Sequence, residues 1–182
     1  DYFYYPKEGG IGFVCQKIAK LIISKKGIIK NNITINKIKI SKGKVSTLEY
    51  KENGRKNLIK TDFVISTISL SDVVKLFEYP IPEKVKKSVD KLKYKNLILA
   101  YIFTNKSRVL KDNWIFFPES NFIFNRISEQ KSFSPYTAPK NKSAIIVEIT
   151  CSREDSIWNL GEKELYEKIL IDLQKADIIN KE

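Results

Sequence analysis

Arg126 and Glu148 are charged residues inside segments that are otherwise largely apolar. Alternation along residues 122–127 puts Arg126 on the same face as Phe124, and residues 144–150 give Glu148 a similar setting. A guanidinium or a carboxylate in a partly dry space is costly unless it is paired or binds a ligand. The pattern therefore predicts either a structural ion pair between these two residues or a substrate contact made by both.

Three aromatic residues lie in neighbouring strand-like segments: Tyr101, Trp114 and Phe116. Rings in such positions either pack in the core or line a ligand cavity. The candidate substrate-binding residues are therefore Tyr101, Trp114, Phe116, Phe124, Arg126 and Glu148.

The residue types exclude several catalytic mechanisms. The chain has no histidine, which rules out Ser-His-Asp and Cys-His machinery and histidine-ligated metals. Gly9, Gly10 and Gly12 resemble a phosphate loop only weakly, because Cys15 stands where the third glycine of GxGxxG is needed. No Walker motif, GxSxG elbow or acidic metal cluster is found. We assign no catalytic residue and expect no metal site.

Charge and composition favour a protein that binds neither DNA nor RNA. The formal net charge is +12, but only four of the 33 basic residues are arginine, the side chain on which phosphate and base recognition depends most. No apolar run approaches the roughly 20 residues of a membrane-spanning helix, and no signal peptide is recognisable. Cys15 and Cys151 form no disulfide framework, so we expect both to be reduced and buried, in a cytoplasmic protein.

Hydrophobic periodicity predicts an α+β fold. Helical spacing of apolar residues predicts helices over 11–26, 69–77, 83–92 and 162–176, the first ending at a left-handed Gly27. Gly43 and Asn53-Gly54 mark hairpins in a small β-meander over 28–40, 44–51 and 58–66. An aromatic-rich, antiparallel or mixed sheet should follow over 96–104, 113–117, 121–127 and 143–151, with a polar loop at 128–142.

Eight segments, in chain order, resemble the flavin-dependent amine oxidase superfamily, which includes protoporphyrinogen oxidases and phytoene desaturases. The first four are YPKEGGIGFVCQKIAKLI, NNITINKI, DFVISTISL and LKYKNLILAYIF. The later four, NWIFFPES, FNRISEQKSFSP, VEITCS and IWNLGEKEL, are similar to bacterial and archaeal protoporphyrinogen-oxidase-like members.

The resemblance implies a central piece of a two-domain flavoprotein. Residues 1–70 would belong to the FAD domain and residues 71–182 to the substrate-binding domain. NNITINKI matches the strand that meets the adenine end of FAD, which makes Ile35 a candidate cofactor contact, and VISTISL adds Ser66 and Thr67. The family's GxGxxG element and its C-terminal flavin-contacting segment are not found, so this piece alone is not expected to retain FAD or to be active. Its partners would be the other parts of the same flavoprotein and a small-molecule substrate.

Three hypotheses of function follow. The leading one is the substrate-binding region of an FAD-dependent oxidoreductase that removes a hydride from a C–N or C–C bond. The alternatives are a non-redox flavin mutase resembling UDP-galactopyranose mutase and a stand-alone binding module without a redox role.

Overall fold

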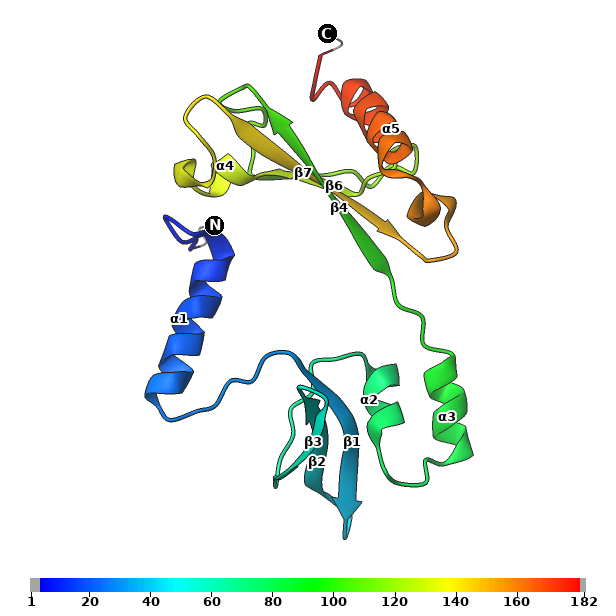
Figure 1. The fold of residues 1–182 in the computed structure, drawn as a ribbon. Coiled ribbons are helices and arrows are strands. Elements are labelled where there is room, and N and C mark those ends of the chain that lie inside the picture. The colour runs from blue at the N-terminus through cyan, green and yellow to red at the C-terminus, as the bar shows by residue number, and fades with distance from the viewer. Residues whose placement is uncertain (1–3, 181–182) are drawn as a thin grey trace. The chain divides into compact units, whose positions relative to one another are not determined.

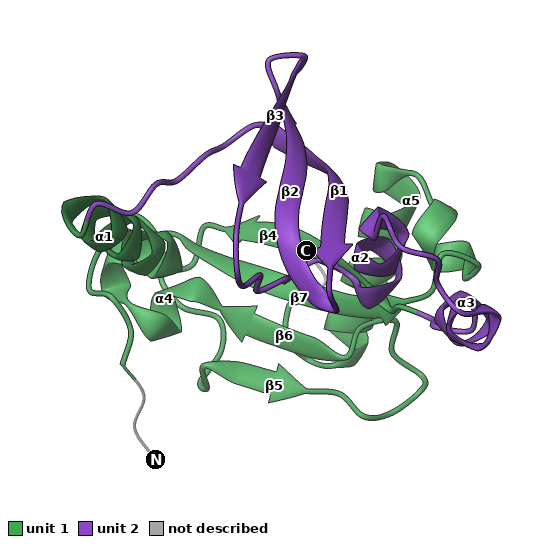
Figure 2. Ribbon diagram, turned by 90° about the horizontal axis from the view of Figure 1, so that it is seen from below, with its two compact units in different colours: residues 1–25, 94–182 green, residues 26–93 purple. Residues whose placement is uncertain are grey.

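The computed structural model describes residues 4–180, and the chain divides into two compact units (Figure 2). Residues 26–93 form one unit, and the segments before and after them form the other. The described helices and antiparallel sheets confirm the α+β class. The division at residue 70 concerns the two domains of a full-length flavoprotein, and it stays a prediction.

The unit of residues 26–93 is built on a β-meander. Strands β1 (Ile33–Ser41), β2 (Lys44–Glu52) and β3 (Arg55–Lys60) pair antiparallel in that order. Positive φ angles at Lys42-Gly43 and Asn53-Gly54 are the backbone signature of tight hairpins, as the sequence predicted. The third strand is shorter than predicted. It ends at Lys60, and the chain then bends where the Thr61 hydroxyl donates to the carbonyl of Phe63 (2.7 Å).

Two short helices complete this unit, α2 (Leu70–Leu76) and α3 (Glu83–Asp90). Ser69 caps α2, because its hydroxyl accepts a hydrogen bond from the backbone of Asp72. The end of α2 is tied to β1, where the backbone N–H of Glu78 donates to the carbonyl of Ile38 (2.9 Å).

The other unit begins with helix α1 (Gly10–Ser24), close to its predicted range. No residue of α1 is buried. The predicted left-handed residue is wrong by one position, because Lys26, with φ 64°, adopts this conformation instead of Gly27.

A four-stranded antiparallel sheet organises this unit, with strand order β4-β7-β6-β5 (Figures 1 and 2). Its strands are β4 (Asn96–Thr104), β5 (Trp114–Phe116), β6 (Arg126–Glu129) and β7 (Ser143–Cys151). The bounds of β4 and β7 are those predicted. Strand β6 starts five residues later than predicted. Residues 121–125 lie outside the strand, and the rings of Phe122 and Phe124 pack in the core.

Helix α5 (Glu162–Lys175) covers one face of the sheet. Ile169 and Leu173 of α5 pack there against Ile127, Val147 and other buried side chains. The predicted polar loop at 128–142 contains two short helical turns, α4 (Gln130–Phe133) and a 3₁₀ turn at Pro135–Thr137. A further 3₁₀ turn, at Ser156–Asn159, was not predicted.

The two cysteines are free thiols in different settings. Cys151 is buried as predicted, but Cys15 is exposed, because α1 buries none of its residues. Burial raises the pKa of the Cys151 thiol and the nearby Asp155 raises it further, so the thiol is protonated at neutral pH. Among residues 4–180, no helix is long and apolar enough to cross a bilayer.

Candidate functional site

The register of the four-stranded sheet places five of the six candidate substrate-binding residues on one face. Phe116 pairs with Arg126, which pairs with Glu148. One step along the same face, Trp114 pairs with Ser128, which pairs with Ile146, and Ile146 pairs with Tyr101. Residues directly opposite each other in an antiparallel sheet point to the same side. We call this side the open face and define it by Leu97, Leu99, Tyr101, Phe103, Trp114, Phe116, Arg126, Ser128, Ile146 and Glu148.

Large apolar side chains on the open face remain in contact with solvent. Phe103 is 80% exposed, Phe116 62% and Tyr101 53%. A contiguous apolar surface of this kind marks an interaction or ligand-binding site more often than ordinary protein surface does. Helix α5 packs on the opposite side of the same strands, so the sheet has one core face and one face whose large apolar side chains are exposed.

Arg126 and Glu148 form a bidentate ion pair in the middle of the open face. Arg126 Nε donates to Glu148 Oε1 (2.9 Å) and Arg126 Nη2 donates to Glu148 Oε2 (2.8 Å). The Glu148 side chain is 15% exposed, whereas that of Arg126 is 42% exposed. The ion pair, one of the two predicted alternatives, is therefore present, and a substrate contact by these residues stays a prediction. The guanidinium also lies over the ring of Phe116, 5.5 Å from its centroid.

Trp114 belongs to an aromatic group at the β5 end of the open face. Its ring stacks on Phe133 of α4, with 5.8 Å between the centroids, and Phe133 in turn contacts Tyr5 at 5.3 Å. Segments from three distant parts of the sequence thus hold this ring.

Phe124 does not belong to the open face, which corrects the prediction that it shares a face with Arg126. Its side chain is fully buried, and its ring packs edge-on against Phe117 (4.9 Å) and stacks with Phe122 (5.6 Å). The alternation rule fails here because residues 121–125 precede β6 and fold these rings into the core.

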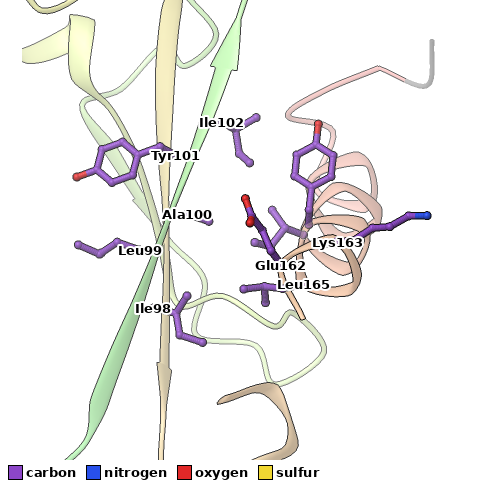
Figure 3. A pocket seen from close by; sticks show the side chains of 10 residues that line it. Ile98, Leu99, Ala100, Tyr101, Ile102, Glu162, Lys163 and Leu165 are labelled. Atoms are coloured by element: carbon purple, nitrogen blue, oxygen red, sulfur yellow. The ribbon is translucent and has the colours of Figure 1, made fainter. Parts of the chain in front are cut away.

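A cavity of about 730 Å³ lies between β4 and α5 (Figure 3). Ile98, Ala100 and Ile102 point from β4 toward α5, whereas Leu99 and Tyr101 point to the other side of the strand. The cavity borders the core face, so Tyr101 touches it only at the strand itself.

Glu129 is a buried charged residue that the sequence did not single out. It has no exposed surface, and it accepts hydrogen bonds from the backbone of Val109 (2.9 Å) and Leu110 (2.7 Å) and from the hydroxyl of Ser143. Because the sequence placed this residue in a polar loop, no pattern pointed to its burial.

The three candidate cofactor residues lie in the unit of residues 26–93. Ile35 is half-buried on β1, beside a bulge between Ile35 and Lys37, whereas Ser66 and Thr67 are exposed in the irregular segment after β3. In the bulge, Asn36 Oδ1 is buried and is the only such side-chain atom without a hydrogen-bond partner in the described part of the chain. The contacts of these residues with a cofactor stay a prediction.

The described residues contain no group of three or more Cys, Asp or Glu side chains arranged to hold a metal ion. The chemistry available on the open face is therefore that of aromatic surface and one ion pair.

Comparisons with known proteins concern the family and the fold. Residues 3–180 match the family model of flavin-containing amine oxidoreductases. No curated protein sequence matches the chain significantly.

Three solved structures illustrate the structural likeness. Reduced UDP-galactopyranose mutase has a TM-score of 0.78 at 18% identity, over 98% of this chain and 38% of that one. An oxidoreductase from Methanosarcina mazei has 0.73 at 20% identity, over 92% of this chain and 39% of that one. A double mutant of putrescine oxidase has 0.63 at 12%, over 92% and 35%. At these identities the likeness shows the fold, and the chain spans about two fifths of the length of these proteins.

Proposed function

The chain belongs to the family of flavin-containing amine oxidoreductases, and from this premise we propose that its open face forms a wall of the substrate cavity in an FAD-dependent oxidoreductase. The proposed reaction removes a hydride from a C–N or C–C bond of a small molecule. The observation that carries the proposal is the open face itself, where exposed aromatic side chains surround one bidentate ion pair. Activity belongs to the full-length protein, and residues 1–182 alone are proposed to be inactive.

On the open face, the aromatic side chains hold the apolar part of a substrate and exclude water. Arg126 gives two of its N–H groups to Glu148, which leaves three donors of the guanidinium for a polar group of the substrate. Glu148 fixes the guanidinium in one orientation. The structural ion pair is thus compatible with a substrate contact, because Arg126 can bind Glu148 and a substrate at the same time.

FAD is the proposed cofactor, with Ile35, Ser66 and Thr67 as residues that hold it. The family match supports the cofactor, and the resemblance of NNITINKI and VISTISL to the family's cofactor-contacting strands supports the three residues. When bound, FAD supplies the hydride acceptor. This chain's own residues bind and orient the substrate.

A non-redox mutase is the second candidate, because UDP-galactopyranose mutase is among the solved structures with this fold. A UDP-sugar carries a diphosphate, which requires cationic groups beyond those of an ordinary apolar ligand. Arg126 is the single cation among the residues that define the open face, and Glu148 neutralises it. This balance of charge favours the oxidoreductase.

Anaerobic mixing of the FAD-loaded full-length protein with putrescine, with a hydrophobic secondary amine and with UDP-galactopyranose separates the two candidates. Bleaching of the flavin absorbance by an amine supports the oxidoreductase. Conversion of the sugar nucleotide without net bleaching supports the mutase. The absence of both excludes the mutase and these amine substrates, and it leaves an oxidoreductase that acts on a C–C bond or a binding module.

Tyr101→Ala tests whether the open face takes part in either reaction. We expect it to weaken substrate binding without loss of FAD. Ile171→Ala is the matched control, because Ile171 is exposed but lies on α5. We also propose a cytoplasmic location, supported by the two free thiols.

A further inference from the structure

We propose that Glu129 is a positioning residue for Trp114, acting from the core side of the sheet on the open face. The inference rests on the proposed function in one respect, namely that Trp114 contacts a substrate. The geometry by which Glu129 fixes the start of β5 stands independently of that function.

The carboxylate of Glu129 anchors the chain that leads into β5. Its two oxygens accept the backbone N–H groups of Val109 and Leu110 at 2.9 and 2.7 Å. Neither of these residues belongs to a strand or a helix. The Glu129 carboxylate therefore supplies the hydrogen-bond partners that a neighbouring strand would supply in a β-sheet. The two hydrogen bonds together fix the carboxylate and the backbone of residues 109 and 110 relative to each other.

The same residue also holds the segment through its backbone. Glu129 N–H donates to the carbonyl of Asn113 (3.2 Å), the residue directly before Trp114. Glu129 therefore fixes the approach to β5 at two places, residues 109–110 and residue 113. Because β5 has only three residues and forms an edge of the sheet, the position of Trp114 depends on its pairing with β6 and on the chain that leads into β5.

Arg108 binds the carbonyl groups of the same segment, whereas Glu129 binds its N–H groups. Its Nε donates to the carbonyl of Leu110 (2.8 Å) and its Nη2 to the carbonyl of Lys111 (2.7 Å). The donors and acceptors of this turn are thus taken by two charged side chains, and Leu110 is buried in the core between them. An apolar residue at position 129 would leave two N–H groups unsatisfied, which explains why a carboxylate stands in the core.

The test follows Trp114 by its fluorescence. The chain has two tryptophans, so Trp158→Phe leaves Trp114 as the single reporter. In this background Glu129→Gln puts an amide N–H₂ against a backbone donor. We expect the emission of Trp114 to shift to longer wavelength, and quenching by iodide to increase.

Asp172→Asn is the matched control. Asp172 is the other buried carboxylate that accepts a backbone N–H, that of Ile123 (2.7 Å), but it lies on α5. It should lower stability and leave the emission of Trp114 unchanged. Ser143→Ala, which removes one of the three partners of Glu129, should give a smaller shift in the same direction as Glu129→Gln.

Unchanged emission in folded Glu129→Gln, or an equal shift in Asp172→Asn, would overturn the inference. If Glu129→Gln does not fold, the comparison of Ser143→Ala with Asp172→Asn decides. None of these outcomes depends on a substrate or on FAD, so a failure here leaves the proposed function intact, and a failure of the proposed function leaves the positioning of Trp114 intact.

Discussion

The substitution Glu148→Gln measures what the central ion pair of the open face contributes to stability. Glutamine keeps one acceptor for Arg126 but loses the charge and one of the two hydrogen bonds. A hydrogen bond to a charged group contributes about 1.5–3 kcal/mol. Because the Arg126 side chain is 42% exposed, water replaces part of the lost contact, and we expect a loss of about 1–2 kcal/mol.

The assay is urea unfolding followed by tryptophan fluorescence. Trp114 and Trp158 both lie in the unit that contains the four-stranded sheet, so the fluorescence signal reports the unfolding of that unit. The matched control is Glu164→Gln, since Glu164 forms an exposed i,i+4 pair with Lys168 on α5 of the same unit. We expect it to cost about 0.3–0.5 kcal/mol.

Equal losses for Glu148→Gln and Glu164→Gln would refute the stabilising role of the bidentate geometry. A loss above about 3 kcal/mol would refute the argument from solvent exposure, since that size is typical of a fully buried pair. In the full-length enzyme, we expect Glu148→Gln to lower turnover while FAD remains bound.

Three further predictions follow from the two faces, the charges and the cofactor site. Phe124→Ala should destabilise the chain by about 3–5 kcal/mol in the same unfolding assay, because it empties a core position, whereas Tyr101→Ala should cost under about 1 kcal/mol. Hydrogen bonding to Lys37 lowers the pKa of Glu78 in the folded protein. The stability that this ion pair contributes is therefore present above the pKa of Glu78 in the unfolded state, and it is lost as the pH falls through the pKa of Glu78 in the folded state. A carbon-13 NMR titration that gives Glu78 an unshifted pKa would contradict this. The purified chain should be colourless after desalting, and a retained flavin spectrum would show that it holds more of the cofactor site than proposed.

The periodicity of the sequence was sufficient to predict the elements whose local pattern and pairing agree. Strands β4 and β7 have their predicted bounds because each contains a nearly uninterrupted run of apolar residues with polar residues at its ends. Arg126 and Glu148 were recognised as charged residues within apolar segments, but the register that pairs them was not predicted from the sequence. The hairpin at Asn53-Gly54 was predicted because these two residue types adopt positive φ at little cost.

Tertiary contacts account for the features that were missed. Phe124 sits in a segment whose composition suits a strand, but its ring packs with two other phenylalanines in the core. Glu129 is the last residue of the short strand β6 and occupies a core-facing position, where the backbone of a segment about 20 residues earlier and the hydroxyl of Ser143 make a carboxylate suitable. Such partners are set by the fold, and no local pattern reveals them.

The charged pair on the open face is itself an argument for a role beyond stability. A buried or half-buried ion pair can often be replaced by apolar side chains of similar size without loss of stability. The neighbours of Glu148 across the sheet include Leu99, and those of Arg126 include Phe116, so an apolar pair would fit the surroundings. A face that served only to cover other protein would gain from that replacement. The proposed function gives the ion pair a reason, because a face that recognises the polar group of a small molecule needs the donors of Arg126 held in one orientation by Glu148.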